Sequence, residues 1–144
     1  MSMGEEWAFS RYYSMNEIFH NGKRMAKDVM LLEDAELNTS IPPRPLLERL
    51  KPYSCYATLF LYGPQLQTIA AGITRQYNQI TVFKTREPAK LLWSLSPIDT
   101  ANTEQGVVIR VAGLETETVK GWLKEILSNL EGVIGRDAYK RAFV

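Results

Sequence analysis

Residues 106–130 read GVVIRVAGLETETVKGWLKEILSNL and predict a strand followed by a helix. In the first part, Val107, Ile109 and Val111 alternate with other residues, as they do in a strand that buries one face. From Thr116, or a neighbour that caps the helix, apolar residues recur with the spacing of an amphipathic helix. This spacing is kept by Val119, Trp122, Leu123, Ile126, Leu127 and Leu130.

The dipeptide Asn21-Gly22 is a strong short-range signal for a β-hairpin, because both of its positions tolerate the positive φ that a tight turn needs. Before it, alternating side chains predict a strand over residues 7–13 and a second short strand over residues 15–20. After it, residues 23–32 predict the returning strand. We therefore expect an antiparallel meander in the first third of the chain.

The middle of the chain predicts strands around one helix. Residues 54–62, SCYATLFLY, are apolar on both faces, which is typical of a central strand. Pro64 is well placed at the start of a helix. Residues 91–95 predict a further strand, which ends at Pro97. The apolar face of the helix consists of Leu66, Ile69, Ala70 and Ile73.

The remaining segments predict connections and short elements. Residues 33–45 are rich in proline and predict a connector, and residues 44–50 predict one or two helical turns. Residues 80–84 predict a strand and residues 99–105 a polar loop. The basic residues of 136–144 predict a tail that is flexible or bound to a partner.

This order of elements predicts a strand-rich α+β fold, with antiparallel or mixed sheets and two helices packed on sheet faces. A length of 144 residues suits a single domain, spanning 1–144.

Composition excludes several classes of protein. With 17 Lys plus Arg against 16 Asp plus Glu, the net charge is +1, so we do not expect a nucleic-acid partner, which calls for a basic stripe. A single Cys and a single His exclude an intrachain disulfide and multi-Cys or multi-His metal sites within one copy. No signal peptide opens the chain and no apolar run is long enough for a bilayer, so we expect a cytoplasmic protein without a membrane partner.

The sequence contains no catalytic triad, metal cluster or cofactor-binding loop, so no catalytic residue is assigned and we do not expect an enzyme. Cys55 lies in an apolar strand, where a thiol is inert, and no second His is available to activate it. His20 lies beside a turn, where an exposed imidazole is the ordinary case. The basic residues along 75–90 suit a protected sheet edge better than an RNA site. Such a protein most often works by contact.

The chain resembles the urease accessory proteins called UreD or UreH. In that family a Gly-Glu start leads into an aromatic strand, a Glu-Ile strand, a glycine turn and a strand ending in leucines. The order is kept here by Gly4-Glu5-Glu6-Trp7-Ala8-Phe9, Asn16-Glu17-Ile18, Asn21-Gly22, Asp28 and Leu31-Leu32. In the second half it is kept by Tyr56-Ala57-Thr58-Leu59, Gly63-Pro64, Gly106 to Val111, Gly113, the helix of Val119 to Leu130, and Gly135-Arg136.

The resemblance implies a non-catalytic urease maturation factor, a nickel-insertion chaperone. Such a scaffold binds the urease apoprotein and recruits two further accessory proteins, one of them a GTPase. Nickel would be in transit, with no tightly bound cofactor, and Glu17 and Asp28 are the first carboxylates to test along its path. Family members are longer, so the chain corresponds to the C-terminal portion of such a scaffold. Apolar surface exposed in a shorter chain can be covered by a second copy, so a homo-oligomer is also expected.

An alternative reading from the residues is a small-ligand-binding or regulatory α+β module of unknown ligand. It predicts a concave apolar pocket near Trp93 and Trp122, which lie in a predicted strand and in the last predicted helix.

Overall fold

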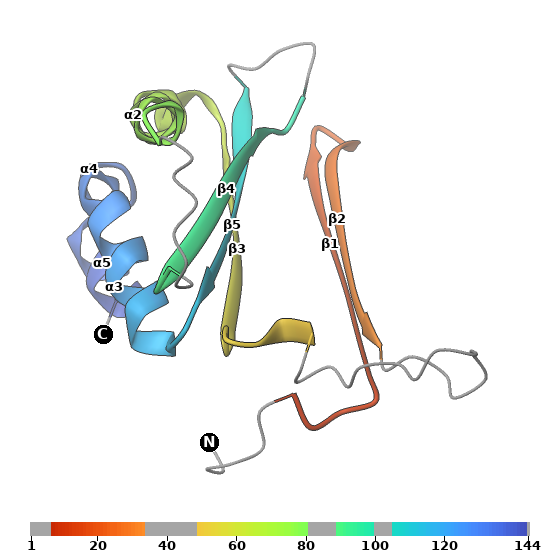
Figure 1. Cartoon of the computed structure of the whole chain (residues 1–144). Coiled ribbons are helices and arrows are strands. Elements are labelled where there is room, and N and C mark those ends of the chain that lie inside the picture. Colours follow the sequence, from red (N-terminus) through yellow and green to blue (C-terminus); the bar gives the residue numbers. More distant parts are fainter. Residues whose placement is uncertain (1–6, 34–48, 81–88, 100–104, 144) are drawn as a thin grey trace. The chain divides into compact units, whose positions relative to one another are not determined.

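The computed structural model describes residues 7–33, 49–80, 89–99 and 105–143. It divides into two compact units, residues 1–54 and residues 55–144. The expected single domain over 1–144 stays a prediction. The strand-rich α+β class is confirmed, since five strands form two antiparallel sheets and helices follow in the second unit (Figure 1).

The first unit contains a two-stranded antiparallel hairpin, formed by β1 (Arg11–His20) and β2 (Lys23–Glu33). The turn is confirmed, because Asn21 has φ 50° and Gly22 has φ 75°, both in the left-handed region. The expected break between two strands before the turn is wrong. Ser14 pairs with Met30, and the register is regular from Arg11 to Ile18, so one long strand replaces the first two strands of the meander. The register shifts between Ile18 and Phe19, near the turn.

The second unit contains a three-stranded sheet with the order β3-β5-β4. Its strands are β3 (Cys55–Tyr62), β4 (Leu91–Pro97) and β5 (Gly106–Gly113), and both pairings are antiparallel. The three strands are confirmed, but the expected central position of residues 54–62 is wrong. β5 is the central strand and the most deeply buried one, because it alone has a strand on each side.

Helices lie on one face of this sheet (Figure 1). As predicted, helical structure begins at Pro64 and the last long helix begins at Thr116. Its neighbour Glu115 occupies the capping position, without a side-chain hydrogen bond to the helix. The helical elements are η1 (Pro64–Leu66), α2 (Gln67–Asn78), α3 (Thr116–Ile126), η2 (Ser128–Leu130), α4 (Glu131–Ile134) and α5 (Arg136–Ala142).

The hydrophobic core lies between these helices and the sheet. Ile109 of β5 is completely buried, and it pairs with Leu59 of β3 on one side and Leu95 of β4 on the other. The predicted face of Val107, Ile109 and Val111 is buried, but the alternation is incomplete, because Val108 on the other face is buried as well. The buried core cluster consists of Leu61, Ala70, Ile73, Val107, Ile109 and Leu127.

The end of the chain differs from the flexible tail expected over residues 136–144, because residues 136–142 form helix α5. Two contacts hold this helix: the Tyr139 hydroxyl donates to the Lys124 carbonyl at 3.4 Å, and Phe143 packs against the core. The Tyr139 and Phe143 rings lie 4.9 Å apart. Their spacing of four residues puts both rings on one helix face, a pattern that the basic composition obscures.

Several predicted segments lie wholly or mostly outside the described residues. These are the connector of 33–45, the strand of 80–84 and the loop of 99–105. Of the helical turns predicted over 44–50, only residues 49 and 50 are described, and both are helical.

Candidate interaction surfaces

The hairpin register determines which side chains share a face. Asn16 lies directly opposite Asp28, and Glu17 lies directly opposite Lys27. Because opposed residues share a face and successive residues alternate, Glu17 and Asp28 project from opposite faces of the hairpin. The structure therefore does not bring the two predicted nickel-path carboxylates together in one site.

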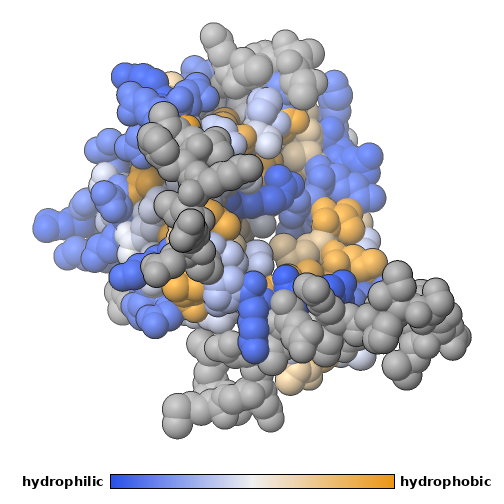
Figure 2. Space-filling model, viewed as in Figure 1, coloured by the Kyte–Doolittle hydropathy of each residue, from blue (hydrophilic) through white to orange (hydrophobic). Residues whose placement is uncertain are grey.

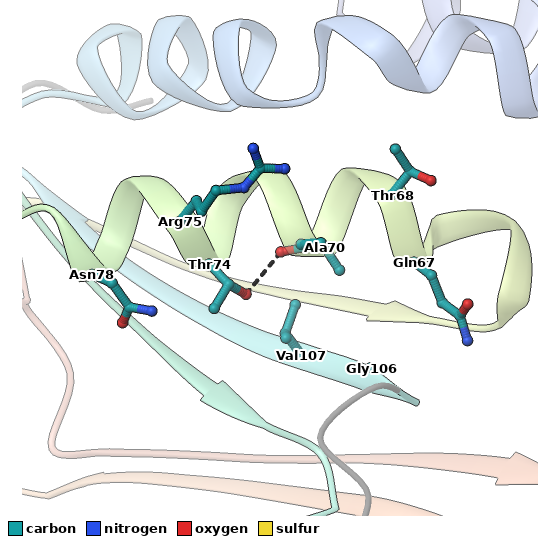
Figure 3. Close-up of a pocket in the computed structure, with 9 residues that line it drawn as sticks. Gln67, Thr68, Ala70, Thr74, Arg75, Asn78, Gly106 and Val107 are labelled. Atoms are coloured by element: carbon teal, nitrogen blue, oxygen red, sulfur yellow. Dashed lines mark hydrogen bonds between the residues drawn. The ribbon is translucent and has the colours of Figure 1, made fainter.

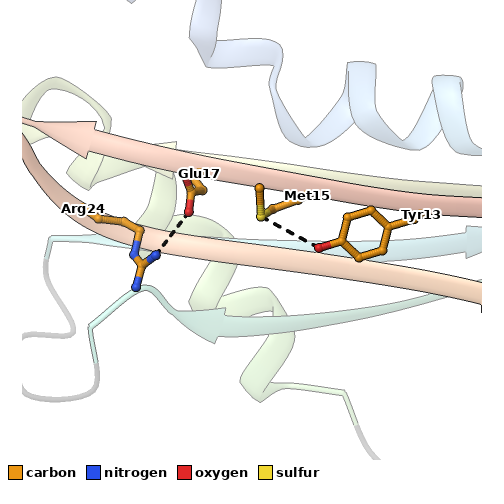
Figure 4. Close-up of polar contacts among 4 residues, drawn as sticks. All are labelled: Tyr13, Met15, Glu17 and Arg24. Atoms are coloured by element: carbon orange, nitrogen blue, oxygen red, sulfur yellow. Dashed lines mark hydrogen bonds and ion pairs between the residues drawn. The ribbon is translucent and has the colours of Figure 1, made fainter.

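Glu17 makes an ion pair across the hairpin. Its Oε1 accepts a hydrogen bond from Arg24 Nη1 at 3.2 Å (Figure 4). The Arg24 side chain is 53% exposed, so water screens the pair and its contribution to stability is about 0–1 kcal/mol. Glu17 remains accessible to a solute or a partner protein, which a nickel-relay role would need.

Asp28 is in the opposite situation. Its residue surface is only 7% exposed, and it is the buried charged side chain of the described residues. It takes part in a polar interaction, as a buried carboxylate must, since an unpaired one is very costly. Asp28 is thus buried, whereas the Glu17 side chain keeps 26% of its surface exposed.

The face of the hairpin that carries Glu17 also carries a row of exposed apolar side chains. Each of these is between 48% and 59% exposed. Tyr13 and Met15 contact one another, with the tyrosine hydroxyl 3.9 Å from the sulfur (Figure 4). Apolar surface gathers over the hairpin in Figure 2. We call this row the apolar stripe; it consists of Tyr13, Met15, Phe19, Val29 and Leu31.

Exposed apolar residues gathered on one side of a strand pair mark an interaction surface more often than scattered ones do. The sequence shows aromatic residues at both odd and even positions of β1, so alternation alone does not reveal the stripe. Its signal appears once the turn is fixed at Asn21-Gly22, because the pairing register then assigns every side chain to a face.

A groove with a volume of about 680 Å³ runs along α2 in the second unit (Figure 3). In Figure 3, Thr74 points toward Val107 of β5, while Arg75 extends away from the sheet. The Thr74 hydroxyl donates to the Ala70 carbonyl at 2.8 Å. We call this the α2 groove; it is lined by Gln67, Thr68, Ala70, Ala71, Thr74, Arg75, Asn78, Gly106 and Val107.

The lining of the α2 groove combines apolar surface with amide and hydroxyl side chains, and it carries one charge. Within the described residues, Arg75 has no ion-pair partner. A guanidinium presents five N–H donors in a planar fork and suits a carboxylate or a phosphate. Arg75 is one of the basic residues along 75–90, and residues 81–88 of that segment lie outside the described residues.

The pocket expected near Trp93 and Trp122 does not coincide with this groove, since neither residue lines it. Instead the two indole rings contact one another at 5.0 Å, and Tyr77 contacts Trp93 at 5.2 Å. These rings join α2, β4 and α3. Large apolar rings at facing positions fill space rather than enclose it.

The two remaining candidate residues show no reactive arrangement. Cys55 begins the edge strand β3 and is partly buried, less so than a central strand would make it. The exposed His20 lies at the turn, with Nε2 3.1 Å from Asn21 Nδ2. Among the described residues, no group of three or more His, Cys, Asp or Glu side chains is placed to hold a metal. In the same ranges, no helix is long and apolar enough to cross a bilayer.

Comparison with known proteins gives a consistent picture. A family model described as "UreD urease accessory protein" matches residues 1–143. Similar curated proteins include urease accessory protein 4 of Cryptococcus neoformans var. grubii, which is 30% identical over 95% of this chain, and UreD of Sorangium cellulosum, which is 31% identical over 96%. Urease accessory protein D of Arabidopsis thaliana is 25% identical over 94%.

The chain spans 42% and 39% of the lengths of the first two of these relatives, and 50% of the third. No solved structure matches the chain.

Proposed function

The chain belongs to the UreD family of urease accessory proteins, and on that basis we propose that it acts in urease maturation as a non-catalytic scaffold. In this role it binds the urease apoprotein and further accessory proteins, including a GTPase, in the cytoplasm. The observation that carries the proposal is the family match over residues 1–143. These relatives are more than twice as long as this chain, so the activity of the full-length family protein is itself proposed for it.

The exposed surfaces of both units support a role based on contact. We propose the α2 groove as the surface for the urease machinery. From Gln67 to Asn78 it follows eleven helical steps, about 16 Å, which matches roughly five residues of an extended peptide. Amide and hydroxyl side chains can pair with a peptide backbone, and Arg75 can hold one carboxylate of the partner.

Nickel delivery would use carboxylates as transient ligands. Oxygen ligands hold nickel less tightly than imidazole or thiolate does, which suits an ion that must be released again. Glu17 and Asp28 project from opposite faces of the hairpin. They would therefore serve as separate steps of a path, each completed by other ligands, and not as one site.

A co-purification experiment tests the scaffold role. The chain is expressed with a urease apoprotein and its accessory proteins, and complexes are isolated through a tag on the chain. We expect the apoprotein or an accessory protein to be retained, and Arg75→Glu to reduce the retained amount severalfold. Arg141→Glu is the matched control, since Arg141 is an exposed arginine of α5. Absence of any urease component, with a full-length relative retaining them in parallel, would refute the proposal.

The α2 groove also supports a second candidate function, binding of a small ligand. Its volume of about 680 Å³ lies within the usual range for ligand pockets, roughly 300–1,000 Å³. A panel of small carboxylates and phosphates, screened by thermal unfolding, would favour this function if one of them raised the melting temperature of the chain and not that of Arg75→Gln.

A further inference from the structure

We infer that the apolar stripe of the hairpin binds a second copy of this chain, related by a twofold axis that runs parallel to the strands. The inference does not rest on the proposed function, because it follows from the pairing register of β1 and β2 and from the exposure of their side chains. It concerns a different surface from the α2 groove.

The face that carries the stripe consists of five cross-strand pairs. Two adjacent pairs are apolar, Tyr13 with Leu31 and Met15 with Val29. Oppositely charged pairs flank them on both sides, and at the turn end, beyond the register shift between Ile18 and Phe19, Phe19 lies opposite a cation. The three flanking pairs are Arg11 with Glu33, Glu17 with Lys27, and Phe19 with Arg24.

Such a face is complementary to itself in one orientation. A twofold axis parallel to the strands sets β1 of one copy over β2 of the other, without a shift along the strands. Each β1 side chain then faces the residue that is its own cross-strand partner, but in the second copy. Glu17 faces Lys27 of the second copy, and Phe19 faces Arg24, a favourable cation–π arrangement. Between the two copies, the ionic pairs thus join side chains of opposite charge, and the apolar pairs join apolar side chains.

The other face-to-face twofold orientation is less favourable. An axis perpendicular to the strands and centred on the Met15–Val29 pair reverses the order of residues. It sets Tyr13 opposite Glu17 and Leu31 opposite Lys27, so charged groups would lose water against apolar side chains. Charge complementarity therefore selects the axis along the strands.

The area of the stripe is sufficient for a reversible dimer. Side chains of this size expose roughly 150–200 Å² each when free, so five of them at about half exposure offer about 400 Å² per copy. Together with the charged side chains at the edges of the stripe, two copies would bury a total surface of about 1,000 Å². This is near the lower limit for a specific interface. A two-stranded hairpin is only marginally stable by itself, and a second copy converts it into a four-stranded sandwich.

Sedimentation velocity of the full chain over a wide range of concentrations tests the inference. We expect a monomer–dimer equilibrium. Lys27→Glu and Glu17→Lys should each raise the dissociation constant about tenfold or more, because each sets like charges opposite one another. Lys140→Glu, the same kind of charge reversal on α5, should leave it unchanged.

Mixing the two hairpin variants provides the decisive measurement. In the mixed dimer, lysine at position 17 of one copy faces glutamate at position 27 of the other, and Lys27 of the first faces Glu17 of the second. An equimolar mixture should therefore regain the dimer affinity that each variant loses alone. Met15→Lys, which places a charge within the stripe without touching these pairs, should abolish dimer formation.

Circular dichroism of each variant separates loss of the interface from loss of the fold. A monomer at all concentrations would overturn the inference, and so would a dimer that none of the hairpin variants weakens. A mixture that stays monomeric, with both variants folded, would overturn the proposed axis. Retention of urease components does not enter these measurements, so failure here and failure of the scaffold role are distinguishable.

Discussion

Gly106 shows how closely the backbone approaches its neighbours at the start of the central strand. A Cβ atom added there would lie 2.5 Å from the Leu61 carbonyl oxygen and 2.9 Å from Ile98 Cδ1. The first of these neighbours belongs to the backbone of β3, so it cannot turn aside. Glycine is required here by packing, and not by a positive φ.

Gly106→Ala should therefore lower the free energy of unfolding by about 1–3 kcal/mol. Gly121→Ala is the matched control, because Gly121 lies in α3 and an added Cβ meets nothing within 4 Å. There the better helix propensity of alanine should raise stability by up to about 1 kcal/mol. Urea unfolding of the two variants measures both effects. Equal stability changes would show that the close approach at β5 is not as described.

Glu17 provides a second prediction at the scale of a residue. Removing it with Glu17→Ala breaks the pair with Arg24, and the cost should stay within about 1 kcal/mol because the pair is exposed to water. Under the proposed function, nickel-dependent activation of urease should fall while the fold is kept. Glu131→Ala is the control, since it removes the exposed carboxylate that pairs with Arg136 at 3.8 Å. If Glu17→Ala unfolds the chain, the glutamate is structural instead.

Helix α3 and the turn that follows it depend on one apolar face. Leu127, just beyond the helix, is 4% exposed and belongs to the core cluster, together with Ile109 of β5. The helical periodicity of the sequence identified this face correctly, because a helix that covers a sheet must repeat its apolar residues every three or four positions.

Leu127→Ala should therefore destabilise the protein by about 2–5 kcal/mol, through lost burial and the cavity that remains. Leu92→Ala is the comparison, because Leu92 of β4 is 50% exposed and its truncation should change stability by less than about 1 kcal/mol. Thermal or urea unfolding of both variants gives the difference. Similar values for the two would mean that α3 does not cover the sheet.

Stability is distributed unevenly over the whole molecule. The buried apolar side chains of the described residues all lie in residues 55–144, whereas the buried residue of the first unit is Asp28. A hairpin of two strands without a hydrophobic core is marginal in water, while a sheet covered by helices has a core of its own.

Expression of residues 55–144 alone should therefore yield a folded protein with a cooperative thermal transition. Residues 1–54 alone should show little ordered strand in circular dichroism. The two separate spectra also test whether the chain is a single cooperative domain. If 55–144 is unfolded without the hairpin, the core of the second unit is not self-sufficient.

Patterns that repeat along the chain were predicted well from the sequence. The pairing of strands that are distant in the sequence was not. The hairpin turn follows from Asn21-Gly22, and the strand of β5 from the alternation of Val107, Ile109 and Val111. Both depend on a few consecutive residues. The continuous strand β1 was missed because Ser14 interrupts the aromatic pattern without interrupting the hydrogen-bonded ladder.

The sequence by itself determined the α+β class, the turn, the apolar faces of the long helices and the resemblance to the UreD family, because local conformational preference and hydrophobic period are written in adjacent residues. Only the tertiary structure decided that β5 and not β3 is central, and that Glu17 and Asp28 lie on opposite faces. It alone brought the five apolar side chains of the stripe together. Sheet order and register depend on which distant segments pair, and single-chain patterns do not encode that choice.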